Sequence, residues 1–130
     1  MRAVDTNVLV RLLVGDQRAQ FHAAEDFVGA GAWVSHLVLV ETIWVLSSVY
    51  EIQWSRLADL IGVLLEHQKI ILQEPDVVAA ALARFRTHRS LGFSDCMVLE
   101  CARKAGHFPL GSFDKDLGKQ DGGYRIPSSR

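Results

Sequence analysis

The sequence has no long apolar run and only two cysteines, and its basic and acidic residues are nearly equal in number. No apolar run approaches the about 18 residues of a membrane span, because Glu41 and Glu66 interrupt the longest ones. We expect no signal peptide, since Asp5 and Arg11 interrupt the start of the chain. The two cysteines lie five residues apart in CMVLEC, which reads as helix, so they cannot bond to each other. We therefore predict reduced thiols in a cytoplasmic protein with no membrane partner.

The length, composition and net charge of the chain further limit the class of protein to which it can belong. The chain has 130 residues, which suits one domain, and 49% of them are hydrophobic, which is typical of a folded protein that needs no disulfide. The net charge is only −1, from 14 basic and 15 acidic residues. By itself this balance does not indicate binding to nucleic acid.

The pattern of apolar residues predicts an α/β fold with a parallel sheet, because short apolar runs alternate with helical stretches. We expect strands at residues 2–4, 32–35, 69–73, 109–113 and 124–126. We expect helical segments at residues 16–31, 36–50, 54–66, 75–88, 95–105 and 114–119. About five strands would then have helices on both faces.

Several local features of these helices can be predicted. Asp16 can cap the first of them, Pro75 suits the first turn of another, and Ser94 can cap the helix from residue 95. Segment 54–66 has the spacing of an amphipathic helix. Segment 36–50 is apolar nearly all round, which predicts a helix buried on more than one side.

Three aspartates lie where a predicted strand ends or a helix begins. Asp5 follows the first strand, Asp114 follows the fourth, and Asp95 begins a helix. A carboxylate at such a position can cap the helix or interact with its dipole. Taken singly, none of the three therefore distinguishes a structural role from a functional one.

Glu41 is harder to explain as a structural residue. Its neighbours on a helical wheel are Leu37, Trp44, Val45 and Ser48, so it is expected to face an apolar arc. A charged carboxylate there is costly unless it pairs with a cation. No arginine or lysine is near in sequence, which leaves a distant salt bridge or a bound ion.

The predicted topology brings these four acids together. Ligands of an open parallel sheet bind beyond the carboxyl ends of its strands, where Asp5, Asp95 and Asp114 can meet. Glu41 lies within two turns of the end of strand 32–35 and can reach the same place. At a spacing of about 5 Å and an effective dielectric of about 20, each pair of carboxylates repels by roughly 3 kcal/mol. A divalent cation relieves this repulsion, and an all-oxygen site suits Mg²⁺ or Mn²⁺.

Four segments resemble the motifs of the PIN-domain family, and within it the ribonuclease toxins of VapBC toxin–antitoxin pairs. They are VDTNVLVRLL, LVLVETIWVL, GFSDCMVLECAR and LGSFDKDL, each of which supplies one of the four acids. The resemblance covers nearly the whole chain. It implies a single PIN domain over residues 1–130, with three layers (α/β/α) around a central parallel sheet of about five strands.

The resemblance also implies roles for particular residues. The catalytic acids would be Asp5, Glu41, Asp95 and Asp114, and Asp5, Asp95 and Asp114 among them would hold the metal. Supporting residues would be Thr6, Asn7, Ser112 and Asp116. Glu41 would either orient the attacking water or bind a second ion, and Asn7 would either fix a carboxylate or complete the turn.

The implied activity is magnesium-dependent endonucleolytic cleavage of RNA by the toxin of a type II toxin–antitoxin pair. Mg²⁺ is the implied cofactor, with Mn²⁺ as an alternative. The implied partners are RNA, a cognate VapB-like antitoxin and a second copy in a homodimer. The apolar surplus on segments 36–50 and 54–66 suits such interfaces, and equally an ordinary core.

One basic stretch is a candidate for RNA contacts. Without the four site acids, 14 basic residues face 11 acidic ones, so the rest of the chain carries a charge of +3. The stretch RFRTHR contributes Arg84, Arg86, His88 and Arg89. A solvated helix end, with basic groups favoured by the helix dipole, explains this stretch equally well.

Three other functions fit parts of the sequence pattern. A haloacid-dehalogenase-type phosphatase requires a second aspartate at the position of Asn7, so this sequence fits that class poorly. A receiver domain requires a phosphoacceptor aspartate after its third strand, and here Asp76 falls inside the following helix, so that class also fits poorly. The serious alternative is a non-catalytic binding module whose acidic cluster docks a basic segment of a partner.

Overall fold

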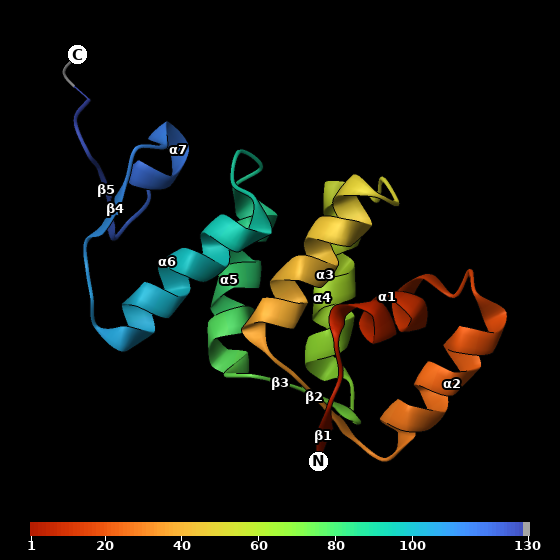
Figure 1. The fold of residues 1–130 in the computed structure, drawn as a ribbon. Coiled ribbons are helices and arrows are strands. Elements are labelled where there is room, and N and C mark those ends of the chain that lie inside the picture. Colours follow the sequence, from red (N-terminus) through yellow and green to blue (C-terminus); the bar gives the residue numbers. More distant parts are fainter. Residues whose placement is uncertain (129–130) are drawn as a thin grey trace. The chain divides into compact units, whose positions relative to one another are not determined.

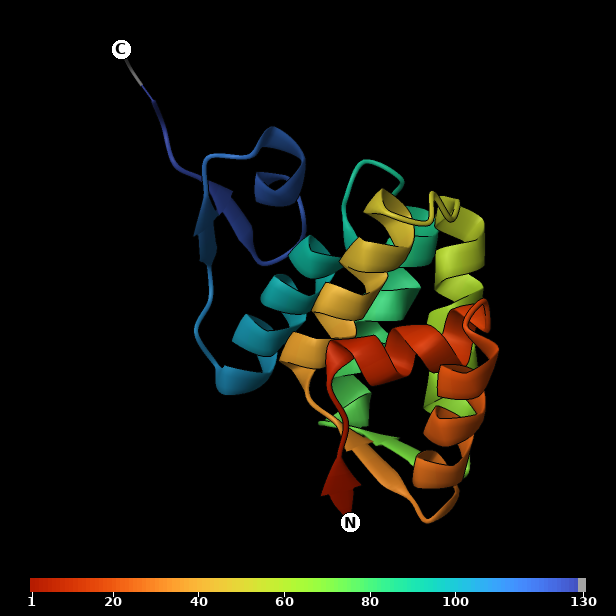
Figure 2. The same ribbon diagram turned by 45° about the vertical axis from the view of Figure 1, so that its right-hand side comes forward.

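The structure is a computed structural model, and it describes residues 1–128. The chain forms two compact units, one of residues 1–75 and one from residue 76 onward. Figures 1 and 2 show the path of the chain through both.

The first unit is a small parallel sheet with four helices. Its elements are β1 (Arg2–Ala3), α1 (Thr6–Val14), α2 (Arg18–Gly29), β2 (Ala32–Val34), α3 (His36–Ser48), α4 (Trp54–Glu66) and β3 (Ile70–Leu72). The strands are parallel in the order β1-β2-β3. Helix α1 packs against α2 and α3, which places the first turn after β1 beside the helix after β2 (Figure 1).

The second unit combines two long helices with a two-stranded parallel sheet. Its elements are α5 (Pro75–Thr87, beginning at the boundary), α6 (Phe93–Ala105), β4 (Leu110–Ser112), α7 (Lys115–Gly118) and β5 (Gly123–Arg125). The short helix α7 packs on both strands. Gly118 permits this close approach, because a Cβ at that position would lie 2.7 Å from the Cβ of Arg125.

The predicted strands all occur, but the expected sheet of about five strands does not. The described residues form one sheet of three strands and another of two. Each strand is only two or three residues long, so each offers few backbone groups for pairing. The α/β class with parallel strands is confirmed, and the single five-stranded sheet is corrected.

The helix boundaries differ from the predictions at two caps. Gln17, and not Asp16, precedes α2, while Asp16 lies 3.7 Å from the guanidinium of Arg11. Helix α6 begins at Phe93 with Gly92 as its cap, so Ser94 is inside the helix. Neither observed cap residue, Gln17 or Gly92, makes a side-chain hydrogen bond to its helix, so the preference for capping side chains does not mark these two boundaries.

The buried face of each helix was predicted well for α4 and poorly for α3. Leu57, Leu60, Ile61 and Leu64 of α4 are buried, as its amphipathic spacing predicts. In α3, however, Leu37 and Trp44 are 85% and 65% exposed, and the buried side chains lie on one face only. A helix that is apolar all round gives no periodicity from which to identify its covered face.

The second unit has a core of its own. Val78, Leu82 and Phe85 of α5 are buried, as expected, and the ring of Phe85 meets that of Phe93 edge to face at 5.7 Å. Pro75 stands at the start of α5, also as expected. Among the described residues, no helix combines the length and the apolar character that crossing a membrane requires.

Candidate active site

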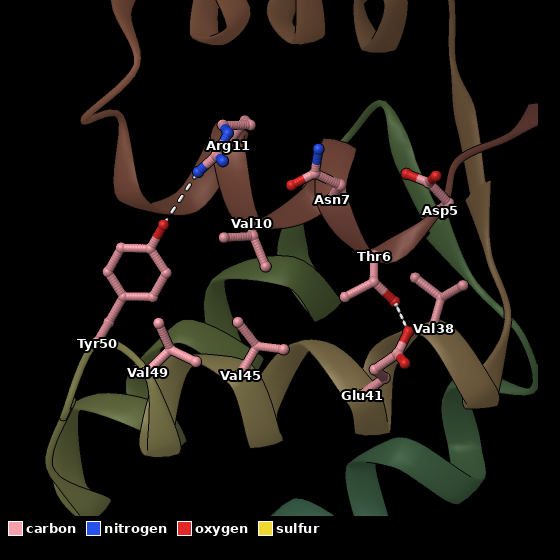
Figure 3. Close-up of a pocket in the computed structure, with 10 residues that line it drawn as sticks. All are labelled: Asp5, Thr6, Asn7, Val10, Arg11, Val38, Glu41, Val45, Val49 and Tyr50. Carbon is pink, nitrogen blue, oxygen red and sulfur yellow. Dashed lines mark hydrogen bonds between the residues drawn. The ribbon is translucent and has the colours of Figure 1, made fainter.

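A pocket of about 560 Å³ lies in the first unit between α1 and α3 (Figure 3). Its walls come from the first motif on one side and the second motif on the other. The lining residues are Asp5, Thr6, Asn7, Val10 and Arg11 of the α1 segment and Val38, Glu41, Val45, Val49 and Tyr50 of the α3 segment. The structure thus brings together four residues that the sequence singled out: Asp5, Thr6, Asn7 and Glu41.

Asp5 has the structural role that its position before a helix predicts. It is the N-cap of α1, and its Oδ1 accepts a hydrogen bond from the Val8 backbone N–H at 3.1 Å. The side chain is exposed at the edge of the pocket, and the cap bond engages only one of its two oxygens. Capping therefore fixes the carboxylate without using up its capacity to bind a cation.

Glu41 faces the same pocket from α3. The hydroxyl of Thr6 donates a hydrogen bond to Oε1 of Glu41, which links the first motif to the second (Figure 3). The expectation that Glu41 lies in a buried apolar environment is wrong, because its side chain is exposed. Its neighbours on the helical wheel, Leu37 and Trp44, are also exposed, so the charge of Glu41 carries no burial cost.

The opposite end of the pocket is basic and aromatic, and no prediction from the sequence named it. Arg11 donates through Nη1 to the Tyr50 hydroxyl at 3.0 Å and through Nε to Gln20 Oε1 at 2.6 Å. Asp16 lies 3.7 Å from the same guanidinium. A cue was present, because Arg11 is six residues after Asp5 and thus under two helical turns away.

The other predicted acids lie in the second unit. Asp95 is half-buried in the first turn of α6. Asp114 is exposed and caps α7, accepting from the Leu117 N–H at 2.8 Å. The Ser112 hydroxyl oxygen accepts from the backbone N–H of Asp114 at 3.0 Å, so Ser112 supports the turn that presents this acid. Asp116 is half-buried in the first turn of α7.

A further acid, which the sequence reading passed over, organises this second unit. Glu100 is only 5% exposed. Its carboxylate lies 3.3 Å from Arg84 Nη2 and 3.1 Å from Arg103 Nε. Arg84 also donates to Gln120 at 2.7 Å, and Arg103 donates to the Asp121 carbonyl at 3.3 Å. These contacts tie the segment after α7 to α5 and α6.

These contacts bear on the predicted RNA-binding stretch. The Arg84 side chain is only 17% exposed, and its guanidinium is occupied by Glu100 and Gln120. This arrangement weighs against a phosphate contact by Arg84. Arg86 and Arg89 are exposed on the same stretch, and their assignment to RNA stays a prediction.

The donor set of the pocket fits a hard divalent cation. Asp5 and Glu41 offer carboxylate oxygens, the ligands that Mg²⁺ and Mn²⁺ prefer. Within residues 1–75, all of which are described, no basic side chain forms an ion pair with either of them. Across the described part of the chain, no group of three or more His, Cys, Asp or Glu side chains is arranged as a metal site. The pocket therefore supplies part of a ligand set.

Comparison with known proteins identifies the family. The model of the PIN domain matches residues 2–123, which is nearly the whole chain, so the protein belongs to the PIN-domain family. PIN domains are generally nucleases, which gives the coarse class of activity. No curated protein and no solved structure matched the chain.

Proposed function

We propose that this protein is a magnesium-dependent endoribonuclease and the toxin of a type II toxin–antitoxin pair of the VapBC kind. The observation that carries the proposal is the pocket that Asp5 of the first PIN motif and Glu41 of the second both line, with Thr6 hydrogen-bonded to Glu41. The family match supports the nuclease class. The toxin role and the choice of RNA rest on the resemblance of the four motifs, and the cytoplasmic location rests on the two cysteines that are predicted to be reduced.

The proposed metal ligands are Asp5, Asp95 and Asp114, with Mg²⁺ as the ion and Mn²⁺ as its substitute. Asp5 and Asp114 are exposed helix caps, so backbone N–H groups hold each carboxylate in place. Asp95 lies in the first turn of α6. When bound, the ion supplies an activated water near neutral pH and neutralises charge on the phosphate. Asn7, Ser112 and Asp116 are the proposed supporting residues.

Glu41 is the proposed group that orients the attacking water. The hydroxyl of Thr6 donates a hydrogen bond to Oε1, which fixes the rotamer of the glutamate and leaves Oε2 to accept a proton or a hydrogen bond. A carboxylate that is exposed and held in this way is suited to accept a proton from water during hydrolysis. Thr6 is thus proposed as the residue that positions Glu41.

The exposed apolar side chains of α3 and the residue after it suggest where a partner binds. Leu37, Trp44 and Val49 are 85%, 65% and 64% exposed, which is costly unless another surface covers them. We propose that the antitoxin covers this face with apolar residues and places a basic side chain at Asp5 and Glu41. A homodimer completes the proposed assembly, and Arg86 and Arg89 are proposed to contact RNA phosphates.

The test is cleavage of a mixed RNA pool by the purified protein without its partner. Wild type should cut RNA with Mg²⁺ and not with EDTA, and Asp5→Asn should lose activity. Asp26→Asn is the matched control, because Asp26 is an exposed aspartate of α2 that does not line the pocket. Undiminished cleavage by Asp5→Asn would refute the site.

The same experiment addresses the non-catalytic alternative. Because no basic side chain within residues 1–75 forms an ion pair with Asp5 or Glu41, these acids also suit docking of a basic peptide arm. A protein that never cleaves RNA, yet binds a basic peptide more weakly after Asp5→Asn, would be a binding module.

A further inference from the structure

A second pocket lies at the end of the small sheet in the second unit. Its volume is about 610 Å³, and it is lined by Phe113, Arg125, Ile126, Pro127 and Ser128. The pocket is formed where β4 and β5 end, because the Ile126 N–H donates to the Ser112 carbonyl at 2.8 Å. None of its lining residues belongs to the site described above.

Phe113 is the unusual member of this pocket. Its side chain is 68% exposed, although the burial of large aromatic side chains is a main source of folding stability. Phe113 stands between Ser112, which supports the turn, and Asp114, which caps α7. Both flanking residues are fixed by hydrogen bonds, so the aromatic ring is carried on a constrained segment.

The chemistry of the pocket combines a π face with a positive charge. Arg125 is exposed, and in the parallel register its Cα is paired with that of Ser112. Ile126 and Pro127 add apolar walls. Proteins that hold single-stranded nucleic acid use this combination, because a base stacks on the aromatic ring while a basic group holds the backbone phosphate.

The position of the pocket relates it to the proposed reaction. Phe113 lines the pocket and is the sequence neighbour of Asp114, one of the four proposed catalytic acids. We propose that this pocket is a nucleotide subsite for single-stranded RNA, with Phe113 stacking on a base and Arg125 contacting a phosphate. This inference rests on the proposed ribonuclease function.

The experiment measures RNA binding separately from cleavage. A fluorescein-labelled pool of single-stranded RNA, about 12 nucleotides long to match known site sizes, is titrated with each variant in EDTA and followed by anisotropy. A duplex RNA of the same length forms the second arm. The variants are Phe113→Ala, Phe113→Tyr, Arg125→Gln and two controls, and urea unfolding confirms that each one folds.

The two controls are matched to the two proposed contacts. Tyr124→Ala removes another exposed aromatic of the same unit, one that does not line the pocket. Arg56→Gln removes an exposed basic residue of α4 in the first unit.

Phe113→Ala should weaken single-strand binding by about 5- to 150-fold, the cost of losing one stacked base. Phe113→Tyr should retain binding close to wild type, and duplex binding should change little. Arg125→Gln should weaken binding to all sequences and lower the slope of log K against log salt by about 1. Both controls should bind as wild type does.

Other results would overturn the inference. Unchanged binding by Phe113→Ala would refute the subsite, and so would an equal loss in Tyr124→Ala or in Phe113→Tyr. If wild type and Phe113→Ala bind equally while wild type still cleaves RNA, the subsite fails and the proposed function stands. If wild type neither binds nor cleaves RNA, both fail.

Discussion

Two glutamates on long helices, Glu100 and Glu41, differ in their burial and in the side chains that contact their carboxylates. Glu100 of α6 is buried, and two arginines lie within 3.3 Å of its carboxylate. Glu41 of α3 is exposed, and within its own unit its hydrogen-bond partner is the uncharged hydroxyl of Thr6. The charge of Glu100 is neutralised within its own unit, whereas within residues 1–75 no basic side chain forms an ion pair with Glu41.

This difference separates a structural acid from a functional one. Glu100 connects α5, α6 and the segment after α7, so its value lies in holding parts together. Glu41 and Asp5 line a pocket, and no internal cation neutralises them within residues 1–75. Such carboxylates are available to a cation from outside the chain, either a metal ion or a basic side chain of a partner.

The largest expected effect concerns the pair of acids in the pocket. Asp5→Asn and Glu41→Gln should each lower the rate of RNA cleavage by about 100- to 1000-fold, because they remove groups that act on the reacting atoms. Neither should destabilise the fold by a comparable factor, since both side chains are exposed. Single-turnover kinetics and urea unfolding measure the two quantities. Glu66→Gln, an exposed glutamate at the end of α4, should leave both unchanged.

Glu100 should show the reverse pattern. Glu100→Gln should lower the free energy of unfolding by about 3–5 kcal/mol, because it leaves Arg84 largely buried without its counter-charge. Combining it with Arg84→Met should recover part of the loss, which a double-mutant cycle in urea would reveal. If Glu100→Gln alone were as stable as wild type, this would contradict the structural role assigned to Glu100 and Arg84.

Thr6 tests how Glu41 is held. Thr6→Ala should lower cleavage by about 10- to 100-fold, since the loss of a positioning hydrogen bond typically costs that much. Thr6→Ser keeps the hydroxyl that donates to Glu41 and should restore most of the activity. If Thr6→Val were as active as Thr6→Ser, the hydrogen bond would have no part in catalysis.

The smallest expected effect is the loss of stability at high pH that the buried thiol of Cys96 causes. Burial raises the pKa of Cys96 to about 11, because the thiolate would be poorly solvated there. Between its ordinary pKa and this raised value the folded state holds a proton that the unfolded state has lost, so stability falls as pH rises. The slope should approach about 1.4 kcal/mol per pH unit above pH 9.

Urea unfolding at pH 8.5 and pH 10.5 would measure this loss, and Cys96→Ala should show less of it than wild type. Alkylation provides an independent check. Cys101 is only half-buried and should be labelled well before Cys96. Equal labelling of the two cysteines in the native protein would contradict the burial of Cys96.

The sequence predicts the order of elements, the parallel strands and the family more surely than it predicts burial. The sequence predicts that Asp5 and Glu41 lie close together, and both line one pocket with Thr6 and Asn7. It misjudges the environment of Glu41, because a helical wheel shows which residues share a face and not whether that face is covered. In α3, apolar residues on every side remove the periodicity that would have decided this.

Charged pairs that are distant in sequence are the other limit. Arg84 and Glu100 are 16 residues apart on different helices, so no local pattern connects them. The same holds for Arg11 and Tyr50, which are 39 residues apart and close one end of the pocket. A basic stretch such as RFRTHR therefore suggests RNA binding from composition alone, although one of its arginines is engaged inside the protein.

The central claim is that the exposed acids Asp5 and Glu41 bind a cation from outside the chain. Calorimetric titration with Mg²⁺ tests this claim most directly. Wild type and the Asp26→Asn control should bind Mg²⁺ equally, and Asp5→Asn should bind it at least 10-fold more weakly, the lower end of about 10- to 100-fold for a disturbed metal site. Equal Mg²⁺ binding by all three proteins, or binding by none, would contradict the account.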